Sequence, residues 1–154
     1  MGYLKHNVEE HEKAKGLAKQ IEESKNSKEK RKLFEELYIM IYSHHEAEEE
    51  VVFPFVMERL SEDSHKDVVR EMIEEHILAS YQFSTVNQTL LENETWNAKF
   101  STLMEVVEHH MDEEESEFTK LAKKVLTTKE SEELLEQFED AMEKYEQEIK
   151  KKLK

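Results

Sequence analysis

The stretch SHHEAEEEVVFP, residues 43–54, carries the pattern that decides the fold and points to a buried site. It places two histidines just ahead of three glutamates, with valine, phenylalanine and proline close behind. Residues four apart in a helix share a face, with Cβ atoms about 6 Å apart, so His44 and Glu48 point the same way. Apolar residues continue that face on both sides: Leu37, Ile41, Val52 and Phe55. A carboxylate buried on such a face needs a partner, and a metal ion is one such partner.

A second stretch, EHHMDEEESEF at residues 108–118, repeats the arrangement. A shift of 65 residues carries His44-His45 onto His109-His110, Glu48 onto Glu113 and Phe53 onto Phe118. The same shift carries Glu9-Glu10-His11 onto Glu74-Glu75-His76. Three histidines in each half at matched spacing indicate a duplicated helical hairpin.

The composition favours long helices. Only two glycines and one proline occur in 154 residues, and 38% of the residues are charged. Five helices are predicted, over residues 3–24, 28–60, 65–91, 96–125 and 130–153. Pro54 predicts a bend near Glu50, and Thr128 is the expected cap of the last helix. The predicted fold is all-α: an antiparallel up-down four-helix bundle over residues 1–126, with an additional C-terminal amphipathic helix, residues 127–154, packed on it.

Several classes of protein are excluded or disfavoured by composition. The absence of cysteine excludes disulfides, thiolate metal sites and a cysteine nucleophile. The net charge of −15 argues against a nucleic-acid partner, because phosphate contacts need clustered Lys and Arg. No run of about 18 apolar residues predicts a membrane span, and the N-terminal MGYLKHNVEEHEK lacks the apolar core of a signal peptide. We therefore expect a cytoplasmic protein.

The repeat gathers four imidazoles and two carboxylates from all four bundle helices. Nitrogen and oxygen ligands without sulfur suit iron, or manganese, better than a structural zinc site. In the predicted arrangement, His11 and His44 hold one ion and His76 and His109 hold the second. Glu48 and Glu113 bridge the two ions. The predicted metal ligands are therefore His11, His44, Glu48, His76, His109 and Glu113.

Two questions remain open at the level of sequence. His45 and His110 are turned by about 100° from the predicted ligands beside them, so each is an additional ligand, a hydrogen-bond partner or a surface residue. A slip of one residue, to His110 and Glu114, is the alternative for the second half, because Phe118 then follows Glu114 by one helical turn.

The motifs HHEAEEEVVFP and HHMDEEESEF, each behind an EEH helix, resemble the hemerythrin HHE cation-binding domain. The resemblance covers about residues 6–126. It implies a four-helix bundle with two iron ions joined by an oxo or hydroxo bridge, which binds O₂ or another small diatomic ligand or senses oxygen or iron. Alternatives within the family are a di-iron redox enzyme (oxidase, peroxidase or nitric oxide handling) and an iron-donating repair protein.

One departure from the family pattern affects the expected function. Oxygen-carrying hemerythrins supply a fifth histidine four residues after the one on the third ligand helix, and here Ser80 holds that position after His76. The departure lowers the expectation of reversible O₂ carriage and favours redox, sensing or iron-handling roles. A monomer or a homodimer is expected.

Overall fold

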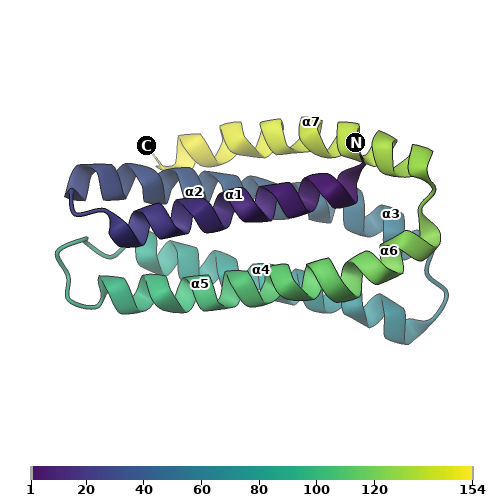
Figure 1. Cartoon of the computed structure of the whole chain (residues 1–154), viewed down its shortest axis with the longest axis horizontal. Coiled ribbons are helices and arrows are strands. Elements are labelled where there is room, and N and C mark those ends of the chain that lie inside the picture. Colours follow the sequence, from purple (N-terminus) through teal and green to yellow (C-terminus); the bar gives the residue numbers. More distant parts are fainter. Residues whose placement is uncertain (1, 154) are drawn as a thin grey trace.

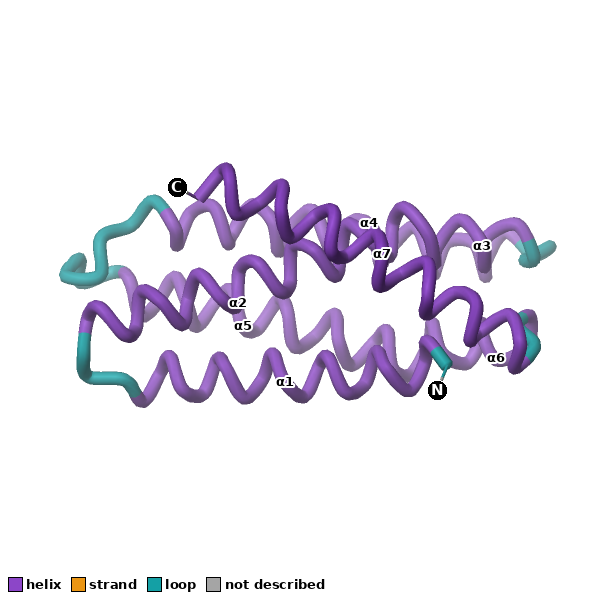
Figure 2. The backbone as a smooth tube through the Cα atoms, turned by 90° about the horizontal axis from the view of Figure 1, so that it is seen from above, coloured by secondary structure: helices purple, strands orange, loops and turns teal. Residues whose placement is uncertain are grey.

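The computed structural model describes residues 2–153, and within that range every regular element is a helix. Four helical rods run antiparallel in an up-down-up-down order, and a fifth helix lies along the outside (Figure 1). The loops gather at the two ends of the molecule (Figure 2). The predicted all-α bundle with an extra C-terminal helix is confirmed. No helix within residues 2–153 is both long enough and apolar enough to cross a membrane.

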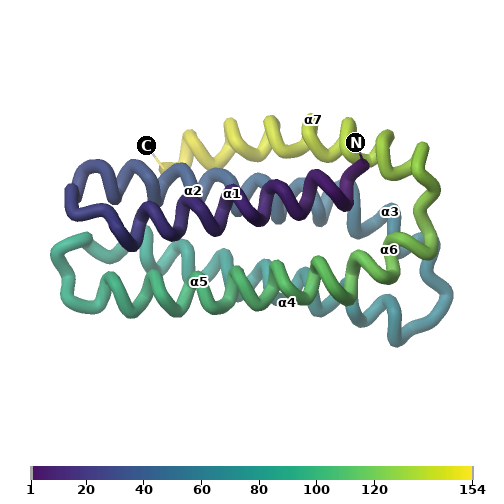
Figure 3. Tube along the Cα trace, in the orientation of Figure 1, coloured from purple at the N-terminus to yellow at the C-terminus, as the bar shows by residue number. Residues whose placement is uncertain are grey.

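The helices follow the predicted order along the chain (Figure 3). Their bounds are α1 (Tyr3–Glu23), α2 (Ser27–Ala47), η1 (Glu48–Val52), α3 (Phe53–Glu58), α4 (Asp63–Asn87), α5 (Trp96–Glu113), η2 (Glu114–Phe118), α6 (Thr119–Val125) and α7 (Thr128–Leu153). The second rod is α2, η1 and α3 in series, and the fourth is α5, η2 and α6. The largest difference from the predicted bounds is at the end of α4, which stops at Asn87 rather than Leu91.

Both composite rods widen into a π-helical turn where the glutamate-rich motif begins. In η1 the backbone N–H of Phe53 donates to the carbonyl of Glu48, and in η2 the N–H of Thr119 donates to the carbonyl of Glu114. Pro54 is the second residue of α3, just after η1, and lacks a backbone donor; the bend predicted near Glu50 stays a prediction, and the structure has a π-helical turn at this position. No proline accompanies η2. Turns of this kind are often found at functional sites.

The fifth helix, α7, is capped by Thr127 rather than by the expected Thr128. The N–H of Glu130 donates to Thr127 Oγ1 over 3.1 Å, and the N–H of Thr127 donates to Glu130 Oε1 over 2.9 Å. This reciprocal pair is a capping box, which satisfies two backbone donors at once. The helix then packs against α2, η1 and α1. Its Phe138 is fully buried, with ring centres 5.0 Å from Tyr3 and 5.1 Å from His44.

The interior consists of two apolar clusters with a polar band between them. One cluster is formed by residues of η1, α3, α6 and α7 with the beginning of α4. The other joins the far halves of α1 and α4 to α2 and α5, around Phe34, Trp96 and Phe100. On α1, Tyr3 belongs to the first cluster and Ala14 to the second. The polar residues between such positions lie at the middle of the bundle, enclosed by apolar packing at both ends.

Truncation of Phe138 to alanine tests how much α7 contributes to the fold. Removing a fully buried phenylalanine leaves a cavity, and we expect a loss of about 3–5 kcal/mol in the free energy of unfolding. Urea unfolding followed by circular dichroism measures it. The neighbouring exposed Gln137→Ala is the matched control and should change stability by less than about 0.5 kcal/mol. Equal effects of the two variants would show that α7 is not part of the cooperative core.

Candidate metal centre

In the polar band, seven buried side chains are close enough to one another to hold metal ions. They are His11 from α1, His44 and His45 from α2, Glu48 from η1, His76 from α4, His110 from α5 and Glu114 from η2. The side chains of Glu48 and Glu114 have no exposed surface at all. Every helical rod of the bundle therefore contributes to one enclosed cluster of imidazoles and carboxylates.

The two composite rods present the same motif to the centre. His44 lies one turn before Glu48, and His110 lies one turn before Glu114. In each rod the glutamate is the first residue of the π-helical turn. The spacing between these two motifs is 66 residues, whereas His11 and His76 are 65 residues apart. The second motif is therefore displaced by one residue from a strict 65-residue repeat, and His110 rather than His109 faces inward.

The structure does not bring His109 and Glu113 into the buried cluster, which corrects their predicted placement. The side chain of His109 is 67% exposed and that of Glu113 is 34% exposed, and the two face each other at 3.2 Å on the outside of α5. One residue corresponds to about 100° around a helix, so His110 and not His109 faces the centre. The alternative register, His110 with Glu114, is the one that the fold brings together.

The register with His109 and Glu113 was predicted because the 65-residue repeat aligns Phe118 with Phe53. Phe53 follows Glu48 by five residues, whereas Phe118 follows Glu114 by four. Both phenylalanines are nonetheless buried and pack edge to face, with ring centres 5.2 Å apart. A π-helical turn holds more residues than an α-helical turn, so positions four and five after its first residue both return toward the same face.

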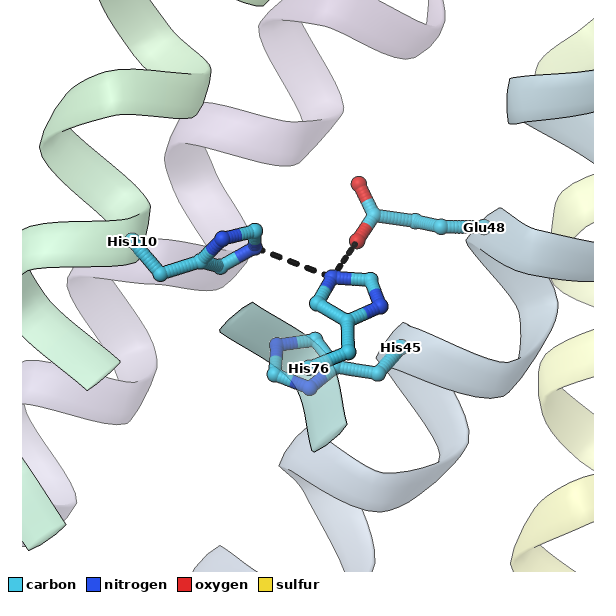
Figure 4. A group of neighbouring side chains, drawn as sticks. All are labelled: His45, Glu48, His76 and His110. Carbon is cyan, nitrogen blue, oxygen red and sulfur yellow. Dashed lines mark hydrogen bonds and ion pairs between the residues drawn. The ribbon is translucent and has the colours of Figure 1, made fainter. Parts of the chain in front are cut away.

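The ligand atoms divide into two groups. Atoms of His11, His44 and Glu114 lie within 4.8 Å of one another, and so do atoms of His45, Glu48, His76 and His110. Figure 4 shows the second group, with Glu48 and His110 pointing toward the ring of His76 from opposite sides. A third group of Glu75, His109 and Glu113 lies at the surface.

Each buried carboxylate spans both groups. Glu48 Oε2 lies 3.6 Å from His44 Nε2, and Glu48 Oε1 lies 3.3 Å from His76 Nε2. In the same way, Glu114 Oε1 lies 3.2 Å from His11 Nε2, and Glu114 Oε2 lies 3.5 Å from His110 Nε2. A carboxylate with one oxygen toward each of two sites is the arrangement that can bridge two cations.

Three of the histidines are held from behind by an outer carboxylate. The Nδ1 atoms bond to these carboxylates at 2.7 Å for His11 with Glu115, 2.9 Å for His76 with Glu49 and 2.8 Å for His110 with Glu75. A carboxylate on Nδ1 fixes the ring orientation and leaves Nε2 as the inward-facing atom, which is the usual support for a metal-bound histidine.

The donor set fits a metal, because the polar atoms at its centre do not satisfy one another. Glu48 Oε1 and Glu114 Oε2 are buried and accept no hydrogen bond from the described residues. His76 Nε2 and His110 Nε2 face each other at 3.0 Å. Buried polar atoms are rarely left without partners, and here two unpaired carboxylate oxygens lie beside imidazole nitrogens. A cation would satisfy both oxygens.

Two residues of α1 that the sequence analysis missed hold the outer oxygens of the carboxylates. The Tyr3 hydroxyl donates to Glu48 Oε2 over 2.5 Å, and Asn7 Nδ2 donates to Glu114 Oε1 over 2.7 Å. Asn7 Oδ1 also bonds to His44 Nε2 at 2.8 Å. Both residues share the inner face of α1 with His11, at steps of four residues. That spacing is the signal in the sequence that could have identified them.

The remaining histidine, His45, lies flat against His76. Their ring centres are 3.7 Å apart and the rings are inclined by 7°. Burial, with the neighbouring rings of His76 and His110, keeps the pKa of His45 well below its usual value. A neutral imidazole beside His76 can bind a metal or hydrogen-bond a ligand.

Burial and like charges perturb the pKa values of several side chains in the cluster. Burial, together with the Glu114 carboxylate, raises the pKa of Glu48 to about 7. Burial alone would lower the pKa of His110, but the carboxylates of Glu114 and Glu75 outweigh it and raise that pKa to about 10. Burial lowers the pKa of His44 to about 4. Protons therefore take the place that cations would hold on Glu48 and His110.

Comparison with known proteins agrees with this geometry. Residues 5–122 match the hemerythrin HHE cation binding domain family. The crystal structure of a hemerythrin HHE cation binding domain-containing protein from Mycobacterium kansasii is 27% identical in sequence, with a TM-score of 0.85. The match covers 99% of this chain and 92% of that one. No curated protein gives a match. Since the family match spans most of the chain, the protein belongs to the hemerythrin HHE cation-binding domain family.

Proposed function

We propose that the chain holds two iron ions at the centre of the bundle and binds O₂ or another small diatomic molecule there. The residues proposed to hold the ions are His11, His44, Glu48, His76, His110 and Glu114. His45 is an additional candidate ligand. One observation carries the proposal: two fully buried carboxylates each direct one oxygen to each of two histidine pairs.

Iron bound in this set would supply redox chemistry and a coordination position for a small ligand. The protein contributes the rest. Glu49, Glu75 and Glu115 orient three imidazoles, while Tyr3 and Asn7 position the two carboxylates. The two apolar clusters exclude water from both ends of the centre. Nitrogen and oxygen donors in this ratio also suit manganese.

A second candidate is a di-iron redox enzyme. The observation that favours it is the small Ser80, one turn after His76, which lines an open pocket where a substrate could reach the centre. Admission of O₂ to the reduced, iron-loaded chain separates the two candidates. A spectrum that returns on removal of O₂ supports ligand binding, whereas rapid irreversible oxidation with turnover of a reductant supports an enzyme.

Adjacent histidines of α5 provide a matched test of the ligand set. After anaerobic loading with Fe²⁺, the wild-type chain should hold about two irons. His110→Ala should hold one or none, because it removes an inward-facing nitrogen, whereas the exposed His109→Ala should load as the wild type does. Iron per chain is measured by plasma mass spectrometry, with circular dichroism to verify folding.

A second pair of variants guards against a folding defect in the first. Glu114→Gln keeps the shape of the buried side chain but removes its charge, and Glu113→Gln makes the same change at the surface. The proposed ligand set requires loss of iron only in Glu114→Gln. Loss of iron in both surface variants, with retention in both buried ones, would restore the His109 and Glu113 register.

Metal binding should also release protons and strengthen as pH rises. The raised pKa of His110 and the pKa of about 7 of Glu48 mean that both groups hold protons near neutral pH in the metal-free chain. A cation must displace these protons, so affinity should rise about tenfold per pH unit for each proton released. His44, whose pKa is lowered to about 4, is already neutral and releases none.

Calorimetry with Mn²⁺ measures this release without oxidation of the metal. Titrations at pH 7 in two buffers of different ionisation enthalpy give the number of protons released per ion, which we expect to be one or more per loaded chain. The same titrations between pH 6 and 8 give the slope. Heats that do not depend on the buffer, with an affinity that does not change with pH, would contradict the proposed ligands.

A further inference from the structure

A pocket of about 350 Å³ opens between α2 and α4, next to the metal centre. Its inner wall includes the rings of His45 and His76. Ser80, one turn after His76, also lines it, and a larger side chain at that position would occupy the space. The volume falls in the range of sites that hold a small organic molecule.

The walls of the pocket are mainly aromatic and aliphatic. Tyr38 and Phe83 line it and stack on each other, with ring centres 4.8 Å apart. Ile77 and Tyr81 stand at the rim and are 55% and 74% exposed, unusually high for such side chains. Large apolar side chains left in water at the mouth of a pocket are typical of a ligand-binding site.

The charges that face the pocket have one sign. Glu46 and Glu49 line it, and no lysine or arginine does. Glu49 is engaged by His76 Nδ1 at 2.9 Å. The half-buried carboxylate of Glu46 makes no hydrogen bond to any described residue. Lys152 lies near enough to act on the Glu46 carboxylate as a charge, but its ion pair is with Glu148 at 3.6 Å.

We propose that this pocket binds a small organic cation, an amine with an aromatic or aliphatic body, with its ammonium group at Glu46 and its body against Tyr38, Ile77 and Phe83. Tyrosine faces attract cations in addition to the carboxylate. Anions are disfavoured because two carboxylates and no lysine or arginine line the pocket. A neutral molecule would gain the apolar contacts but not the charge pairing.

The proposal that a ligand binds here depends only on the pocket. A role for that ligand beside a metal ion rests on the proposed function. A molecule in the pocket would contact His45 and His76 and lie next to Glu49, which orients His76. It would therefore be adjacent to the metal ion that His76 is proposed to hold. A di-iron centre in this chain would therefore be exposed from outside to a small organic cation.

Three probes of nearly equal shape test the proposal: 2-phenylethylammonium, 2-phenylethanol and phenylacetate. Each is titrated into the full-length, metal-free chain labelled with ¹⁵N, and the shifts of backbone amides give the site and the affinity. We expect the cation to bind about tenfold more tightly than the neutral alcohol, with shifts in α2 and α4, and phenylacetate not to bind. Equal affinities for the three probes, or no binding by any of them, would overturn the proposal.

Variants assign the effect to named residues. Ser80→Leu should abolish binding of both the cation and the alcohol by filling the pocket. Glu46→Gln should weaken the cation about tenfold and leave the alcohol unchanged. The exposed Glu36→Gln, on the same helix, makes the same change in net charge and should have no effect. If Glu36→Gln and Glu46→Gln weakened binding of the cation equally, the net charge of the protein rather than Glu46 would be responsible. That result would overturn the assignment.

Iron content, measured in parallel, keeps the two proposals separate. The wild-type chain and both pocket variants should load the same amount of iron, because neither Ser80 nor Glu46 belongs to the proposed ligand set. A chain that binds the cation in this pattern but holds no iron would retain the pocket and refute the proposed function. A chain that loads iron but binds no probe would refute the pocket alone.

Discussion

Two carboxylates, Glu48 and Glu114, lie completely buried at the centre of a helical bundle, where an uncompensated charge would cost several kcal/mol. The rest of the structure serves to compensate them. Five buried imidazoles lie around the pair, Tyr3 and Asn7 donate to one oxygen of each carboxylate, and the other oxygen of each lacks a hydrogen-bond donor among the described residues. Electrostatic balance in the core therefore requires protons on Glu48 and His110 or cations between them.

The bundle isolates this centre by its packing. Apolar clusters close both ends of the polar band, and Phe138 of α7 covers the side on which Tyr3 and His44 lie. Between α2 and α4 the packing is incomplete, and a pocket reaches His45 and His76. The centre is thus covered by α7 over α1 and α2 and open to a molecule from outside at the seam between the two halves of the repeat.

Periodicity and internal repetition were sufficient to predict the all-α bundle, its five helices, and the inward-facing His11, His44, Glu48 and His76. The second motif was harder because adjacent histidines and consecutive glutamates offer two registers. The choice between them depends on the π-helical turn at Glu114, for which the sequence contains no proline or other breaker. Tyr3 and Asn7 were missed because their role comes from packing against other helices. Glu49, Glu75 and Glu115 lie in runs of consecutive glutamates that are typical of a surface. Only the tertiary contacts show that these three bond to the buried histidines.

Glu48 and Glu114 are proposed to hold two ions side by side. Iron K-edge X-ray absorption on the anaerobically loaded wild-type chain tests it most directly, because the fine structure detects an iron neighbour and counts imidazole scatterers. Bridging by the two carboxylates predicts an iron–iron distance below about 4 Å, with both imidazole and carboxylate ligation. Iron without an iron neighbour, in a chain loaded to two ions, would show that the carboxylates do not bridge.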